Sequence, residues 1–127
     1  MRLRISLPSR IFLDADVQKV VAESPAGSFG LLPRHIDMAT ALVPGILAYT
    51  DEAGREQHLA VSEGILVKKA DEVLVSVRTA VSGQLGELRD EVRRFTQELG
   101  EREQTTRTAV AHMEADFVRR FLEFQHG

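Results

Sequence analysis

The pattern of apolar and polar residues changes near Gly83. From Met1 to Val81, apolar residues form short runs, rich in Val, Ile and Leu, that alternate with polar residues and are separated by turn residues. Such runs predict β-strands, and many short strands at close spacing predict a sandwich or a flattened barrel. After Gly83 the apolar residues recur every three or four positions, which predicts amphipathic helix. We therefore expect a β + α chain, with a β domain in residues 1–83 and a helical domain in residues 84–127.

The β domain contains one run that should not form a single straight strand. Pro44-Gly45 lies inside the apolar run Ala41–Tyr49, and a proline cannot donate a hydrogen bond to a central strand, so we expect an edge, a bulge or a sharp bend there. Ser24-Pro25-Ala26-Gly27 and Asp51-Glu52-Ala53-Gly54 are predicted turns. The other predicted strands are Arg2–Leu7, Val17–Ala22, Glu56–Val61, Ile65–Lys69 and Val73–Val77, the last two joined by Ala70-Asp71-Glu72.

Two apolar stripes with helical spacing follow Gly83, and Gly100 separates them. They predict two antiparallel helices that pack against each other as a hairpin, because an isolated amphipathic helix is marginally stable in water. Both stripes are narrow, so either helix could exchange its partner for a helix of another protein. The first stripe consists of Leu85, Leu88, Val92, Phe95 and Leu99, and the second of Val110, Met113, Phe117, Phe121 and Phe124.

Composition limits the function classes. The chain has 127 residues, a formal net charge of -3 and no cysteine, which excludes disulfides, thiolate nucleophiles and cysteine-based zinc sites. The acidic balance gives no reason to expect nucleic-acid binding. No apolar run is long enough for a membrane span or a secretory signal, so we expect a soluble, cytoplasmic protein.

Motifs for catalysis or metal binding do not emerge from the sequence. The four histidines, His35, His58, His112 and His126, are dispersed, and no serine lies in a G-x-S-x-G turn. Gly27-Ser28-Phe29-Gly30 is followed by strand-like residues and not by a helix with G-K-[ST], so it is not a phosphate loop. We therefore expect no catalytic residues, no metal and no cofactor, and an independent enzyme is disfavoured.

Three segments, Gly27–His35, Leu42–Leu47 and Ser62–Val67, follow one another in an order that resembles the epsilon subunit family of F-type rotary ATP synthases. The segment from Gly27 to His35 is similar to that family's G-x-x-G-x-x-P-x-H stretch. Leu42–Leu47 resembles its proline-glycine bend, and Ser62–Val67 resembles its glycine-containing entry to a late strand. The resemblance implies a β-sandwich of about ten strands, followed by two helices. It also implies a non-catalytic central-stalk subunit that couples ion translocation to ATP synthesis and inhibits ATP hydrolysis through its helical tail.

The partners implied by the resemblance are the gamma subunit, the ring of membrane c subunits, and the alpha and beta subunits of the catalytic head. The location it implies is peripheral, on the cytoplasmic face of a bacterial plasma membrane. The alternative to a ring contact for His35 is that its imidazole forms its hydrogen bonds inside its own loop. The ring contact would involve Ser28, Phe29, Arg34 and His35. The contact of the tail with the beta and gamma subunits would involve Arg93, Arg94, Arg102, Arg107, Arg119 and Arg120.

Several positions depart from the family pattern. Glu63 stands where the family usually has a second glycine, Arg34 where a glycine is frequent, and Ser28 where an acidic residue is common. These departures, with the short opening Arg2-Leu3-Arg4-Ile5, make the chain more similar to the alternate, sodium-translocating branch.

The family's nucleotide motif at the start of the first helix is also incomplete. Arg89 is present, but Gly86 replaces an acidic residue and Asp90 replaces an alanine, which argues against ATP binding.

Two further interpretations remain open from the sequence. One is a β-sandwich and helical-hairpin interaction module with no rotary machine as its partner, because fold does not fix function. The other concerns the tail alone: its seven arginines are outnumbered by nine acidic residues between Leu85 and Phe124. With this net negative charge, the tail could bind an acidic surface only through local pairing of single arginines. The alternative is a tail that does not inhibit and only solubilises and braces the sandwich.

Overall fold

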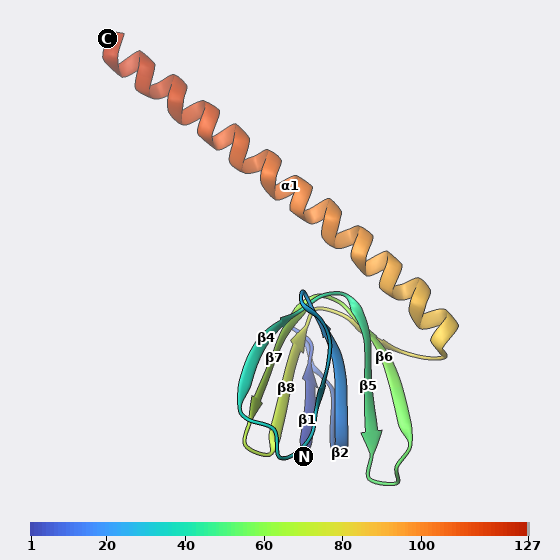
Figure 1. The fold of residues 1–127 in the computed structure, drawn as a ribbon. Coiled ribbons are helices and arrows are strands. Elements are labelled where there is room, and N and C mark those ends of the chain that lie inside the picture. Colours follow the sequence, from blue (N-terminus) through green and yellow to red (C-terminus); the bar gives the residue numbers. More distant parts are fainter. Residues whose placement is uncertain (127) are drawn as a thin grey trace. The chain divides into compact units, whose positions relative to one another are not determined.

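The computed structural model describes the backbone of residues 1–126 and the side chains of residues 1–105. In this part of the chain nine β-strands precede one α-helix (Figure 1). The chain divides into two compact units, Met1–Thr96 and Gln97–Gly127, which we describe separately. The elements are β1 (Arg2–Ser6), β2 (Ile11–Ser24), β3 (Gly27–Leu31), β4 (Met38–Leu42), β5 (Gly45–Asp51), β6 (Glu56–Val61), β7 (Gly64–Lys69), β8 (Glu72–Val77), β9 (Ala80–Ser82) and α1 (Leu85–His126).

The nine strands form two sheets that share β2. The first sheet has the order β4-β7-β8-β1-β2, and the second contains β3, β2, β5, β6 and β9. The first half of β2 pairs with β1, and the second half pairs with β3 and β5. The register of β2 shifts between Val17 and Lys19, where the strand passes from one sheet to the other. β1 and β8 are parallel, whereas the other pairs are antiparallel.

The two sheets enclose one apolar core. Alternate residues of each strand point inward, as in β1, where Leu3 and Ile5 are fully buried and Arg2 and Arg4 are exposed. This alternation follows from the two-residue period of a strand. The buried members of the core are Leu3, Ile5, Val17, Val20, Ala22, Leu31, Leu42, Leu47, Leu59, Val61, Leu66, Val73, Val75, Val77 and Ala80.

Each predicted strand is present, but β2 is longer than predicted, because it begins at Ile11 and not at Val17. Strands β3 and β9 were not predicted. The break expected at Pro44-Gly45 is a crossing between sheets, because β4 ends at Leu42 at the edge of the first sheet and β5 begins at Gly45 in the second. The predicted hairpin turn is held by Asp51, whose Oδ1 accepts hydrogen bonds from the amides of Ala53 and Arg55 at 3.0 and 2.9 Å. The described chain has nine strands where the resemblance implied about ten.

The helical part differs from the hairpin that the sequence suggested. A single helix, α1, continues through Gly100, and the two-helix hairpin is not confirmed. Part of the first stripe packs on the second sheet instead of on another helix: Leu88 and Phe95 are buried against Ala60. Because α1 covers Ala60 on the outer face of β6 while the core covers Leu59 and Val61 on its inner face, the last three residues of β6 are buried. Partly buried neighbours complete this cluster: Ile46, Val81 and Val92.

The second apolar stripe lies outside the side chains that the structure describes. Its prediction as a packing surface therefore stays a prediction. Its members are Val110, Met113, Phe117, Phe121 and Phe124.

Gly64→Ala is expected to lower the free energy of unfolding by about 1–3 kcal/mol. A Cβ atom at Gly64 would lie 2.7 Å from Cγ1 of Val77 and closer still to the carbonyl oxygen of Ser76, so the β7–β8 pairing would have to shift. Denaturant unfolding of the purified chain measures the change. The matched control is Gly86→Ala, where a Cβ would meet no described atom within 4 Å and the helix should gain roughly 0.5–1 kcal/mol. Equal stability of Gly64→Ala and the parent would contradict the prediction.

Candidate functional site

Hydrogen bonds from Lys68 and to Asp37 join two segments at one end of the sandwich, and we call these contacts the lock. Lys68 is on β7 and points inward, and its side chain is 1% exposed. Its Nζ donates hydrogen bonds to the carbonyl oxygens of His35 and Ala70, both at 2.8 Å, and to that of Pro33 at 3.5 Å. A buried ammonium ion is costly unless it is hydrogen-bonded, and its three donors match these three acceptors. Hydrogen bonds to a charged donor contribute about 1.5–3 kcal/mol each.

A second polar contact joins the same two segments. Oδ1 of Asp37 accepts a hydrogen bond from the backbone amide of Ala70 at 2.7 Å. Ala70 adopts a positive φ of 52°, which is unfavourable for a residue with a Cβ. Residues 32–37, which connect β3 to β4, are thus fixed to the β7–β8 turn from both sides. We call residues 32–37 the contact loop.

The contact loop exposes two apolar side chains and two basic ones. Ile36 is 85% exposed and Leu32 is 46% exposed, and Arg34 and His35 are also exposed. The backbone amide of His35 donates to the carbonyl of Leu32 at 3.0 Å, which closes a tight turn within the loop. His35 is therefore held by its backbone, and the described contacts do not satisfy its imidazole inside the loop.

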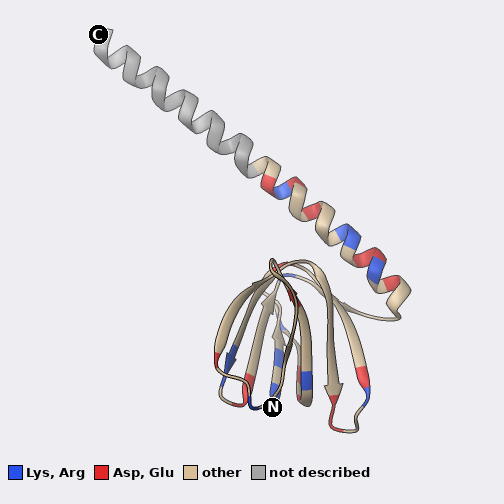
Figure 2. Cartoon of the chain, in the orientation of Figure 1, with Lys and Arg blue, Asp and Glu red and all other residues tan. Residues whose placement is uncertain are grey.

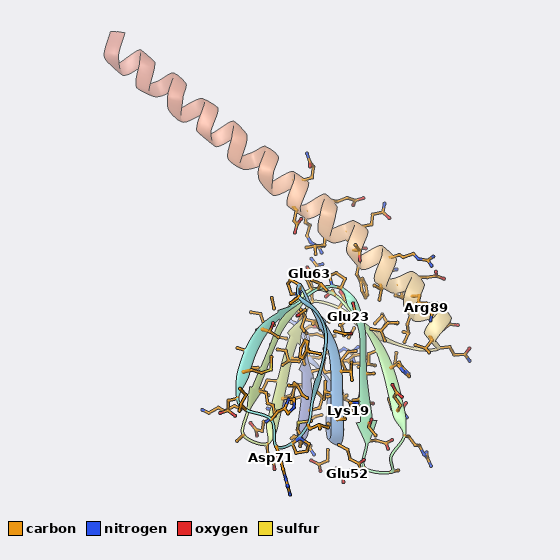
Figure 3. The ribbon with its side chains drawn as sticks, in the orientation of Figure 1. Lys19, Glu23, Glu52, Glu63, Asp71 and Arg89 are labelled. Atoms are coloured by element: carbon orange, nitrogen blue, oxygen red, sulfur yellow. The ribbon has the colours of Figure 1, made fainter. Side chains whose placement is uncertain are left out.

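The four residues predicted to form one ring contact do not lie together. Ser28 and Phe29 are on β3, where Ser28 pairs with Glu23. Figure 3 shows Glu23 at one end of the sandwich and Asp71, beside the contact loop, at the other. Strand β3 carries the chain between these ends at about 3.3 Å per residue. The structure therefore brings Arg34 and His35 together with Ile36 and separates them from Ser28 and Phe29.

A buried hydroxyl organises the opposite end of the sandwich. Oγ of Ser62, which is fully buried, accepts hydrogen bonds from the amides of Arg78 and Thr79 at 3.1 and 2.9 Å. Glu63 follows and forms an ion pair with Arg78 at 3.0 Å. Glu63, which stands where the family usually has a glycine, therefore has a structural role that the sequence did not suggest.

The outer face of the first sheet carries a strip of exposed apolar residues. Ala41 pairs with Ile65 across β4 and β7, and Val67 pairs with Leu74 across β7 and β8. Ile65 is 57% exposed and Leu74 is 40% exposed. Ala39, opposite Val67, extends this surface. We call these five residues the apolar strip. Because its members are neighbours on paired strands, the strip is a candidate interaction surface.

Ion pairs border the apolar strip on β1 and β2. Nε of Arg2 lies 2.7 Å from Oδ1 of Asp14, and Arg4 reaches the same carboxylate at 3.5 Å. The hydrogen bond from Arg2 is the main cause that lowers the pKa of Asp14 from its ordinary value. Asp16 lies 3.4 Å from Arg2 and completes the group. The border has two arginines and two aspartates, so it is close to neutral and does not attract one sign of charge.

The arginines of α1 that the structure describes have different surroundings. Nη1 of Arg93 lies 3.2 Å from Oδ1 of Asp90, and Arg94 pairs with Glu91. Both signs of charge alternate along the described part of α1 (Figure 2). Arg89 lines a shallow groove of about 240 Å³ that Glu23, Gly45, Ile46, Val92 and Arg93 also line. Arg107, Arg119 and Arg120 lie outside the described side chains.

No group of three or more His, Cys, Asp or Glu in the described part of the chain is placed to hold a metal ion. Within the same residues, no helix is long and apolar enough to cross a membrane.

Lys68 and Asp37 were missed in the sequence analysis. A signal for Lys68 was present: in the strand pattern Ile65–Lys69, the alternation places Lys68 on the inward side with Leu66, where a lysine needs buried partners. Asp37 gave no comparable signal, because its partner is a backbone amide 33 residues away.

Residues 1–83 match the sequence model of the family described as "ATP synthase, Delta/Epsilon chain, beta-sandwich domain". The chain is 36% identical over 84 residues to an ATP synthase epsilon chain of Carboxydothermus hydrogenoformans, covering 66% of this chain and 62% of that one. It is 40% identical over 80 residues to an epsilon chain of Anaeromyxobacter sp., covering 63% and 60%. The chain thus spans about three fifths of these relatives.

A solved structure shares the fold. The mitochondrial ATP synthase OSCP/F1/c-ring assembly of Euglena gracilis contains a chain that superposes with a TM-score of 0.60. The sequence identity is 23%, and the match covers 63% of this chain and 51% of that one.

Proposed function

The chain belongs to the family of ATP synthase delta/epsilon chains, and from this membership we propose that it acts as the non-catalytic epsilon subunit of the central stalk in a rotary F-type ATP synthase. In this role it couples ion translocation to ATP synthesis without carrying out chemistry itself. The observation that carries the proposal is the match of the whole sandwich, residues 1–83, to the family.

The apolar strip is the surface that we assign to the gamma subunit. In the second sheet, α1 covers Ala60, Ile46 and Val81, whereas the apolar strip on the first sheet has no described cover. Its central residues, Ile65, Val67 and Leu74, lie on adjacent paired strands, so they present a continuous surface. Burial of such a surface supplies the main favourable term in protein association.

The contact loop is the part that we assign to the ring of c subunits. Ile36 supplies an apolar tip, and Arg34 and His35 supply polar contacts beside it. Ser28 and Phe29, which were first included with them, lie toward the other end of β3 and would need a separate contact. A stiff sandwich suits the transmission of torque from gamma to the ring, because close-packed interiors resist deformation.

The tail is proposed to be a conditional inhibitor of ATP hydrolysis that contacts beta and gamma. Arg93, Arg94, Arg107, Arg119 and Arg120 would pair locally with acidic loops of the catalytic head. A folded-back hairpin, with a hinge at Gly100, is the second state of the tail that this proposal includes. Control comes from contacts with gamma and beta and not from ATP, since Asp90 and Glu23 place negative charge near Arg89.

Two finer assignments follow from the family resemblance. The chain acts on the cytoplasmic side of a bacterial plasma membrane, peripherally and through its complex. The coupling ion is sodium if the chain belongs to the alternate branch that its atypical residues resemble. A sandwich module with an unrelated partner is the competing function, and binding of the cognate gamma subunit separates the two.

The purified chain is expected to bind gamma with one-to-one stoichiometry, and Leu74→Arg to weaken that binding by about tenfold or more. The substitution places a charge on the β8 side of the apolar strip, beside Val67, where the bound state would have to desolvate it. Titration calorimetry with isolated gamma measures both quantities. Leu85→Arg is the control, because Leu85 is similarly exposed at 43% but lies on α1. Absence of gamma binding by the parent chain would contradict the proposed function, and unchanged binding by Leu74→Arg would contradict the surface.

A further inference from the structure

We propose that Lys68 is the positioning residue of the contact loop. Its buried ammonium ion, together with the carboxylate of Asp37, fixes residues 32–37 to the β7–β8 turn so that this end of the sandwich meets its partner as one rigid body. The inference rests on the proposed function for the identity of that partner, the ring of c subunits. The lock itself is a property of this chain alone.

The position of Lys68 in β7 shows that its charge has a specific use. Lys68 shares the inward face of β7 with Leu66, and its strand neighbours Met38 and Val73 are apolar. An apolar side chain would fill this place in the core without any cost of desolvation. The aliphatic stem of Lys68 fills it equally, and the ammonium group emerges under the contact loop.

The acceptors of Lys68 come from segments far apart in the sequence. Pro33 and His35 precede Lys68 by 35 and 33 residues, whereas Ala70 follows by two. One side chain therefore ties the β3–β4 connection to the β7–β8 turn. Asp37 joins the same two segments through the other backbone group of Ala70. Lys68 donates to the carbonyl oxygen of Ala70, and the amide of Ala70 donates to the carboxylate of Asp37.

The lock determines which side chain the loop presents. Ile36 is 85% exposed, although an isoleucine in a free loop would gain by turning toward the core. Its two neighbours are held: the carbonyl of His35 by Lys68, and the carboxylate of Asp37 by Ala70. With both neighbours held, the outward position of Ile36 is enforced by the sandwich and does not depend on a partner.

Hydrogen exchange on the full chain tests the lock without any partner. Lys68→Met keeps the apolar stem and removes the ammonium ion. We expect the amides of His35 and Ala70, which donate to Leu32 and Asp37, to exchange about tenfold faster in this variant. The β2–β5 ladder should keep its protection. Lys69→Met is the matched control, because Lys69 is on the same strand but exposed. Unchanged exchange at His35 and Ala70 in Lys68→Met would overturn the lock.

Coupling in the assembled enzyme tests the positioning role. Ile36→Ser removes the apolar tip directly, and His35→Ala removes the adjacent imidazole. Lys68→Met should lower ion-driven ATP synthesis as much as Ile36→Ser does, with gamma binding unchanged, and Lys68→Arg should restore part of it. If Ile36→Ser lowers synthesis and Lys68→Met does not, the positioning role is overturned while the ring contact stands. If neither Ile36→Ser nor His35→Ala changes synthesis, the ring contact fails, and the exchange rates alone decide the lock.

Discussion

Replacing Phe95 with alanine is expected to lower the free energy of unfolding by about 3–5 kcal/mol. Phe95 is 1% exposed and, with Leu88, covers the outer face of the second sheet at Ala60. Ala60 is too small to fill the space that the lost ring would leave. The change therefore leaves a cavity between α1 and β6 within the unit Met1–Thr96, and both the helix and the sheet lose their contact.

Two spectroscopic signals separate unfolding of the sheet from fraying of the helix. The chain has one tyrosine and no tryptophan, so fluorescence of Tyr49 on β5 reports the sandwich, while far-ultraviolet circular dichroism reports α1. Burial raises the pKa of the Tyr49 phenol, and the Asp51 carboxylate raises it further. Both denaturant midpoints should fall in Phe95→Ala. Leu85→Ala, at a 43% exposed position, should change stability by less than about 0.5 kcal/mol. An unchanged fluorescence midpoint in Phe95→Ala would show that the sandwich does not depend on the helix.

Strands were predictable from the sequence because their signal is local. Alternation in Arg2–Ser6 and Glu72–Val77 states which residues face inward, and the structure buries those residues. The disruption at Pro44-Gly45 was also local, since a missing amide donor breaks any ladder. The local pattern could not show that the chain crosses from the first sheet to the second at this break.

The partner of the first helical stripe was not predictable from its spacing. A narrow stripe fits a second helix or a sheet equally well, and the choice depends on what the sheet leaves uncovered. The run Leu59-Ala60-Val61 carried the missing information, because three consecutive buried residues require cover on both faces of a strand. The small Ala60 in that run is where the ring of Phe95 fits.

The sequence did not show which of the proposed ring-contact residues lie together, for a related reason. Ser28 and His35 are close in the sequence, which suggested one surface. A strand lies between them, and strands separate residues that helices or turns would keep together. Lys68, which organises the surface, is remote in the sequence, and a contact over such a separation leaves no local pattern.

Ending the chain after Thr96 is expected to raise ATP hydrolysis by the assembled enzyme between about 5-fold and 150-fold, the range of ordinary allosteric coupling, if the tail is the inhibitor proposed above. The structure determines where this cut belongs. Ending the chain after Gly83 would also remove Leu88 and Phe95, expose Ala60 and destabilise the sandwich. Loss of inhibition could then not be told from loss of assembly.

The comparison therefore uses three chains: the full chain, residues 1–96 and residues 1–83. Residues 1–96 should bind gamma as the full chain does, because Met1–Thr96 is a compact unit that contains the apolar strip. Arg93 and Arg94 remain in this shorter chain, but each is already paired with an acidic residue one turn earlier. The cut removes Arg107, Arg119 and Arg120 and therefore tests the part of the tail after Thr96. Equal hydrolysis rates for the full chain and residues 1–96, at equal gamma binding, would assign the residues after Thr96 to bracing and solubility. A faster rate only in residues 1–83 would attribute the effect to damage of the α1–β6 contact.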